Sequence, residues 1–147
     1  MPASVHLRAS VVLLAVFLAS GLWIEAALGL RLPALADDPL RREFVRLGHA
    51  HGGILSMANL VMAWVMVRLE TPEGWARVVR PAFFVGAACV GLGFGLGGIF
   101  HGTTDPGPFV LLVPAGAMLW ICGLAAVALV RPGDRPPAHA RNASQQG

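Results

Sequence analysis

Residues 44–67 read FVRLGHAHGGILSMANLVMAWVMV, and this segment indicates the fold class. An apolar run of about 20 residues or more is long enough to cross a hydrocarbon core ~30 Å thick as an α-helix. Three further segments have the same character, at residues 10–30, 81–100 and 108–130. The sequence therefore predicts an all-α, polytopic membrane protein with four transmembrane helices arranged up and down in one bundle.

The composition supports the same class. Of the 147 residues, 56% are hydrophobic and only 13% are charged, which leaves too little polar surface for a soluble domain. We expect one transmembrane domain over residues 1–131, with helices at about 10–30, 39–67, 81–100 and 108–130. Asp38 before Pro39 is a good N-cap for the second helix. Residues 132–147, rich in Pro, Arg, Gln and Ser, predict a disordered cytoplasmic tail.

The arginines predict the orientation and the partners. Placing both termini in the cytoplasm puts more arginines inside than outside, which favours an N-in, C-in topology. Eleven basic residues with no lysine, beside many Ala, Gly and Pro, are typical of a GC-rich bacterium. We therefore expect a multi-pass protein of the bacterial inner membrane, with the lipid bilayer as its main partner. No basic cluster with interleaved aromatics is present, so a nucleic-acid partner is not expected.

Histidines form the main candidate site. His49 and His51 lie near the start of the second apolar segment, His101 ends the third, and Glu25 lies in the first. In an up-down bundle these four and Asp105 fall in the outer half, and ionisable side chains inside a bilayer are costly and usually functional. Apart from the two cysteine thiols, we expect no ionisable residue in the cytoplasmic half of the core.

Haem is the first ligand that this pattern suggests. Neutral imidazole is a common axial ligand, and an apolar groove lined by glycine suits the faces of a porphyrin. His51 is favoured over His49 because it lies deeper and is followed by Gly52 and Gly53. The two imidazoles are about 200° apart around a helix, so they face different neighbours. The expected cofactor-binding residues are His51, His49, Arg42, Arg46, Gly52 and Gly95, with the arginines pairing with the haem propionates.

Two other classes of site remain open. A divalent metal ion would use His49 or His51 with His101 and a carboxylate, either Glu25 or Asp105. A proton relay through Glu25 and the histidines needs no metal. A structural subunit, in which these polar residues only connect helices, is the third alternative.

Two motifs resemble a known family. Ala50-His51-Gly52-Gly53, and the stretch Asp105-Pro106-Gly107 leading to Val113-Pro114-Ala115, are similar to sequences in bacterial styrene oxide isomerases and hydroxylaminobenzene mutases. The resemblance implies a four-helix membrane protein, a trimer with haem b between subunits, and His51 as the axial ligand. It also implies isomerase- or mutase-type chemistry, in which the iron acts as a Lewis acid on a small apolar substrate. The chain is also similar to bacterial four-helix membrane proteins with a His-Ala-His-Gly motif.

The chain departs from the isomerase pattern at two points. The isomerases have an asparagine six positions after the ligating histidine, where this chain has Met57, and Asn59 follows two residues later. The isomerases also use a tyrosine near the substrate, and this chain has none. The sequence therefore favours a haem site over epoxide isomerisation. Glu25 and Asn59 are the candidate catalytic residues.

Overall fold

The computed structural model describes residues 1–129 and contains four long helices in this part of the chain. They are α1 (Ala3–Gly29), α3 (Pro39–Arg68), α4 (Glu73–Ile99) and α5 (Leu112–Leu129), with the short helix α2 (Pro33–Ala36) and the 3-10 helix η1 (Pro108–Leu111) between them. All four spans are long and apolar enough to cross a membrane. The predicted all-α, four-helix transmembrane fold is confirmed. The predicted tail at residues 132–147 lies outside the described residues.

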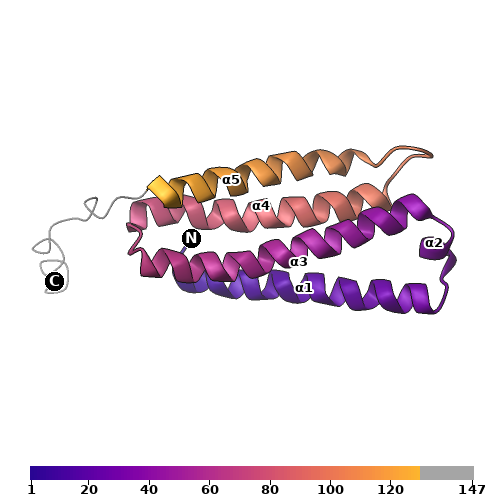
Figure 1. Cartoon of the computed structure of the whole chain (residues 1–147), viewed down its shortest axis with the longest axis horizontal. Helices are drawn as coiled ribbons and strands as arrows, with labels where there is room; N and C mark the ends of the chain where they lie inside the picture. The colour runs from indigo at the N-terminus through magenta and orange to yellow at the C-terminus, as the bar shows by residue number, and fades with distance from the viewer. Residues whose placement is uncertain (130–147) are drawn as a thin grey trace, which may run out of the picture.

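The long helices run up and down, and their main contacts follow the order α1–α3–α4–α5 (Figure 1). Helix α3 packs on both α1 and α4, and α5 packs on α4. The chain begins at one end of this bundle, which we call the amino-terminal end. The opposite end, which we call the α2 end, holds α2 and the loop between α4 and η1 (Figure 1).

Glycine lets α4 approach both of its neighbours closely. A Cβ added at Gly48 of α3 would lie 2.7 Å from the backbone nitrogen of Gly95 and 2.8 Å from the backbone oxygen of Gly91. On the other side of α4, a Cβ at Gly116 of α5 would lie 2.6 Å from the backbone oxygen of Gly86. Small residues permit this backbone-to-backbone packing, which stabilises helix pairs in membranes through van der Waals contact.

The start of α3 agrees with the prediction. Asp38 is the N-cap, its carboxylate accepts a hydrogen bond of 2.9 Å from the backbone N–H of Arg41, and Pro39 occupies the first turn. This cap satisfies one of the amide groups that a helix leaves unpaired at its N-terminus.

The starts of α1 and α4 differ from the prediction. Helix α1 begins at Ala3 rather than near residue 10, and α4 begins at Glu73 rather than at Pro81, which lies inside the helix. A helix of 27 residues is ~40 Å long, more than the ~30 Å of a hydrocarbon core, so hydropathy alone does not find its polar ends. As a consequence, His6 and Arg80 are helical and buried.

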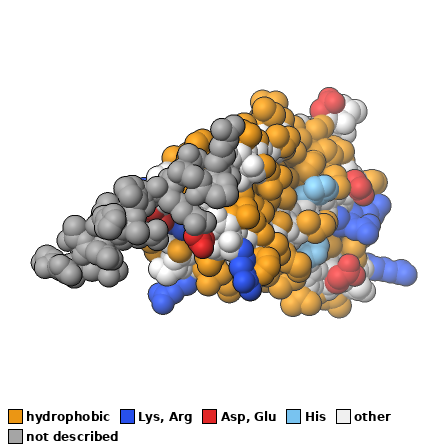
Figure 2. All heavy atoms as spheres, turned by 60° about the vertical axis from the view of Figure 1, so that its left-hand side comes forward, with side chains coloured by type: hydrophobic (Ala, Val, Ile, Leu, Met, Phe, Trp, Pro, Cys, Tyr) orange, Lys and Arg blue, Asp and Glu red, His pale blue; other side chains and the backbone are white. Residues whose placement is uncertain are grey.

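The expectation that the cytoplasmic half of the core, which the predicted N-in topology places at the amino-terminal end, contains no ionisable residue besides the thiols was wrong, because His6 and Arg80 are buried there. The sides of the bundle are nevertheless apolar. Figure 2 shows hydrophobic side chains over most of the visible face, with arginine and acidic side chains toward both ends and histidine side chains toward the right-hand end.

Candidate functional site

A groove of about 760 Å³ lies between α1 and α3 near the α2 end of the bundle. Its apolar lining comes from both helices: Leu18, Gly21, Leu22, Ile24, Leu47 and Ala50. Its polar lining consists of Glu25, Glu43, Arg46 and His49. This volume lies within the range of about 300–1,000 Å³ that is usual for small-molecule sites, which combine apolar walls with a few polar groups.

His49 is held in the groove by a backbone group of the neighbouring helix. Its Nδ1 lies 2.7 Å from the carbonyl oxygen of Phe17, which also accepts a hydrogen bond of 2.7 Å from the hydroxyl of Ser20. A carbonyl oxygen only accepts, so Nδ1 of His49 has the proton and donates. Within residues 1–129 no hydrogen bond involves Nε2 of His49. In the neutral imidazole, Nε2 is then the acceptor nitrogen.

Gly21 makes room for this arrangement. A Cβ at Gly21 would lie 2.2 Å from Cε1 of the His49 ring, so the imidazole occupies the space that a side chain would otherwise fill. The ring thus packs directly on the backbone of α1, one turn beyond the carbonyl that it binds.

Charged groups lie on the same helix faces as His49 and Gly21. On α3, Glu43 and Arg46 precede His49 at spacings of three residues, and on α1 Glu25 follows Gly21 at a spacing of four. Residues three or four apart are neighbours on a helix surface. The groove therefore brings together an imidazole, two carboxyl groups and a guanidinium near the end of the membrane span.

His51 lies on another face of α3. Its Nδ1 lies 3.0 Å from the carbonyl oxygen of Leu47 in the same helix, and its side chain is exposed. Its ring centroid is 5.1 Å from that of Phe94 on α4. As the spacing of two residues predicts, His49 and His51 do not share a site. An exposed imidazole on this face would meet lipid or a second molecule.

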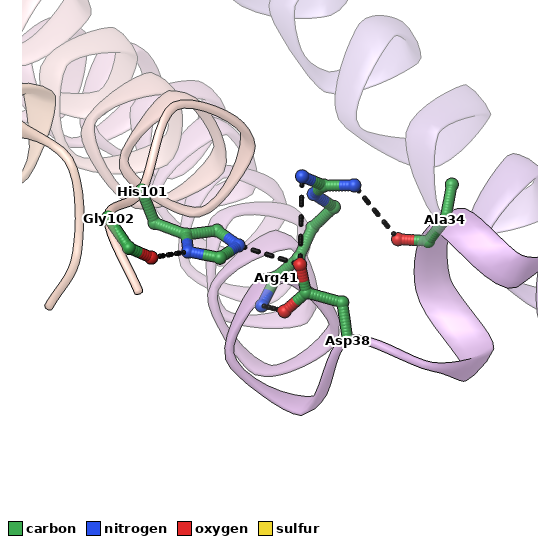
Figure 3. A network of polar contacts seen from close by, with 5 residues as sticks. All are labelled: Ala34, Asp38, Arg41, His101 and Gly102. Atoms are coloured by element: carbon green, nitrogen blue, oxygen red, sulfur yellow. Dashed lines mark hydrogen bonds and ion pairs between the residues drawn. The ribbon is translucent and has the colours of Figure 1, made fainter. Parts of the chain in front are cut away.

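His101 belongs to a hydrogen-bond network outside the spans (Figure 3). Its Nε2 lies 2.7 Å from Oδ2 of Asp38, and its Nδ1 contacts the carbonyl oxygen of Gly102. Arg41 extends the network by donating to the carbonyl oxygen of Ala34 in α2, at 3.2 Å. The network thus joins the end of α4, the start of α3 and α2.

Both ring nitrogens of His101 donate in this network, which favours the protonated imidazole. The carbonyl of Gly102 and, next, the carboxylate of Asp38 raise the pKa of His101 above its ordinary value. The backbone N–H of Arg41 and, after it, the imidazole of His101 lower the pKa of Asp38. With both nitrogens engaged, His101 has no lone pair for a metal ion.

The structure separates several of the other predicted site residues from the groove. Arg42 donates to the carbonyl oxygen of Ala36 at 3.1 Å, so it holds α2. Gly52 receives the ring of Phe17, since a Cβ there would lie 2.4 Å from that ring. Gly95 lies beside Gly48 at the α3–α4 contact.

Asn59 is fully buried toward the amino-terminal end, ~15 Å along α3 from His49. Within residues 1–129 there is no group of three or more His, Cys, Asp or Glu side chains placed to hold a metal ion. The alternative site formed by His49 or His51 with His101 and a carboxylate is not assembled. Of the predicted residues, the groove unites Glu25, Arg46 and His49.

Sequence reasoning missed the contribution of Phe17, Gly21 and Glu43. The periodic small and aromatic residues on α1 are a signal for one packing face, because positions three and four apart fall on the same side of a helix. The acceptor itself, the Phe17 backbone carbonyl, has no signature in the sequence.

The four spans and the groove define the class: the chain is an integral membrane protein with a groove between two of its helices that is lined by apolar and polar side chains. No family model, curated protein or solved structure matches the chain, so the family is not assigned by similarity.

Proposed function

We propose that this integral membrane protein binds haem b in the α1–α3 groove, with His49 as the axial ligand. The observation that supports this most directly is the hydrogen bond from Nδ1 of His49 to the carbonyl oxygen of Phe17. Histidines that bind metals usually donate their second N–H to a carbonyl or carboxylate, which fixes the ring and the tautomer. His49 has this partner already, and in the neutral imidazole its Nε2 would be free to bind iron.

The other lining residues fit the chemistry of haem. The walls contributed by Leu18, Leu22 and Ile24 are apolar, and Arg46 offers a guanidinium for a propionate. Bound haem b would supply an iron centre that acts as a Lewis acid on an oxygen of a small apolar substrate. Glu25 lines the same groove and would be the group that moves a proton there.

The resemblance to the isomerases instead implies that His51, not His49, is the iron ligand. Its Nδ1 also donates to a carbonyl, that of Leu47, and its exposed position beside Phe94 would suit a cofactor shared between copies of the chain. The trimer and the bacterial inner membrane are likewise proposals from the sequence. The two histidines make opposite predictions for single substitutions.

The test is the visible absorption spectrum of protein purified in mild detergent from haem-replete cells. We expect a Soret band at one haem per chain that is lost in His49→Ala and retained in His51→Ala. Gly53→Ala, two residues after His51, is the control for both substitutions, because an added Cβ there meets no atom within 4 Å. Loss of the band only in His51→Ala would make His51 the ligand, and a colourless wild-type protein would refute the haem proposal.

A second candidate function is proton handling without a cofactor. The observation that favours it is that Glu25 and His49 line one groove. In proteoliposomes with a pH-sensitive dye inside, proton uptake driven by a membrane potential should then fall in both Glu25→Gln and His49→Gln. Equal uptake by the wild type, the variants and empty vesicles would leave only a structural role for the pair.

A further inference from the structure

The amino-terminal half of the α1–α3 contact is polar, in contrast to the apolar sides of the bundle. The ring of Phe17 packs on Gly52, which sets the antiparallel register of the two helices. Two helical turns further toward the amino-terminal end, Ser10 of α1 and Asn59 of α3 are level with each other. The buried polar residues on this contact are His6 and Ser10 from α1 and Ser56 and Asn59 from α3.

The two serines are satisfied within their own helices. The hydroxyl of Ser10 donates to the carbonyl oxygen of His6 at 2.9 Å, and the hydroxyl of Ser56 donates to that of Gly52 at 2.6 Å. Hydroxyls often bond back to the preceding turn in this way. They therefore require no further partner.

The side chains of His6 and Asn59 are not satisfied. His6 is 1% exposed and Asn59 is 0% exposed. The backbone carbonyl of Asn59 acts on the His6 ring without forming a hydrogen bond of good geometry, and in the described part of the chain neither ring nitrogen of His6 and neither polar atom of the Asn59 carboxamide makes such a bond. A buried polar group without a partner is destabilising, so such groups in folded proteins are normally paired with protein or with ordered water.

The charges around these side chains exclude an ionic guest. Arg80 of α4 and the amino terminus act on the His6 ring, and both are cationic, which disfavours a bound cation. The guanidinium of Arg80 is already paired, at 3.0 Å, with the carboxylate of Glu73, and it also donates to the carbonyl oxygen of Met1 at 3.3 Å. The paired guanidinium offers little to an anion. A neutral guest that both donates and accepts hydrogen bonds fits the remaining chemistry.

We propose that His6 and Asn59 form a second site, which holds ordered water between α1 and α3. A neutral imidazole and a carboxamide each offer at least one donor and one acceptor, and buried waters typically make two to four hydrogen bonds to such groups. Phe17, which is 5% exposed and packs on Gly52 and Gly91, separates this water from the groove. The site is therefore independent of any ligand in the groove.

The deciding experiment is solid-state NMR of the full-length protein in bilayers with ¹⁵N-labelled histidine. Polarisation transferred from water should reach a ring nitrogen that is assigned to His6 by its disappearance in His6→Phe. Absence of this transfer, with transfer still seen at exposed His51, would overturn the proposal. A direct hydrogen bond between His6 and Asn59 would give that negative result.

A second measurement is the change in Tm caused by Asn59→Leu, which has opposite signs for a site that holds water and for a dry site. Asn59→Leu keeps the volume of the side chain but removes its polar atoms. If the carboxamide binds water, Tm in detergent should fall by about 3 °C or more, whereas a dry, unsatisfied carboxamide predicts that Tm rises. Met57→Leu, on the exposed side of the same helix, is the matched control and should leave Tm unchanged. A rise of Tm in Asn59→Leu would overturn the proposal.

Discussion

The two halves of the α1–α3 contact each contain an imidazole, but in opposite circumstances. Toward the α2 end, His49 is partly exposed in a groove, and its Nδ1 donates to the Phe17 carbonyl. Toward the amino-terminal end, His6 is buried and neither of its ring nitrogens makes a hydrogen bond of good geometry in the described chain. The same pair of helices therefore places one histidine in an open groove and the other in a buried contact.

Phe17 accounts for much of this difference. Its backbone carbonyl fixes the tautomer of His49, and its ring fills the space that Gly52 and Gly91 leave between α1, α3 and α4. One residue thus both positions the groove histidine and separates the two halves. The backbone carbonyl and the ring of Phe17 therefore have distinct roles in two adjacent parts of one helix contact.

The largest expected effect comes from removing the Phe17 ring. Phe17→Ala creates a cavity between the two halves and should lower the stability by about 3–5 kcal/mol, the usual cost of deleting a buried aromatic ring. Equilibrium unfolding in mixed micelles measures this loss. Phe17→Leu retains most of the packing and should cost much less; equal losses in the two variants would show that the ring does not fill the contact.

A smaller effect, confined to the α2 end, is expected from one added methyl group. In Gly21→Ala the new Cβ collides with the His49 ring, which must swing away and lose the bond to Phe17. The expected stability loss is about 1 kcal/mol, the net value of one hydrogen bond, together with a large loss of haem occupancy. Gly29→Ala on the same helix meets no atom within 4 Å and serves as the control. Unchanged occupancy in Gly21→Ala would argue against His49 as the ligand.

The smallest effect concerns pH and the network around His101. Because the pKa of His101 is raised, this residue contributes fully to folding stability at pH values below its ordinary pKa of 6.5. The contribution is lost as pH rises through the raised pKa. Because the pKa of Asp38 is lowered, this residue contributes to folding stability at pH values above its ordinary pKa of 3.8. The contribution is lost as pH falls through the lowered pKa. Stability from this network should therefore be greatest between these two ordinary values.

The measurement is Tm against pH for the wild type and for His101→Gln. The wild type should gain a small increment of Tm at pH 5.5 relative to pH 8.5, and His101→Gln should lack it. Parallel pH curves for the two proteins would show that the His101–Asp38 pair contributes nothing to folding.

Much of the architecture could be predicted from the sequence because it depends on local patterns. The four spans follow from apolar length, the start of α3 follows from Asp38 before Pro39, and the separation of His49 from His51 follows from helix geometry. The early starts of α1 and α4 were not predictable by hydropathy, since His6 and Arg80 look like residues that flank a membrane. Their burial depends on which face each helix turns to its neighbour.

The site was only partly predictable for a related reason. Glu25, Arg46 and His49 were expected and do line one groove, whereas Arg42 and His101 hold the elements at the α2 end. Their partners are the carbonyl of Ala36 and a carboxylate far away in the sequence. Contacts with backbone groups and between distant segments leave no pattern that one sequence reveals.

The assignment of His49 as the iron ligand requires a proton on Nδ1 and an unprotonated Nε2 in the groove. The direct test is the ¹⁵N NMR spectrum of histidine-labelled protein in bilayers at neutral pH and free of added ligand, with the signals assigned by His49→Ala. The account predicts a protonated Nδ1, hydrogen-bonded to the Phe17 carbonyl, and an unprotonated Nε2. A proton on Nε2 with a bare Nδ1 would contradict it, because His49 could not then make this bond or bind iron through Nε2.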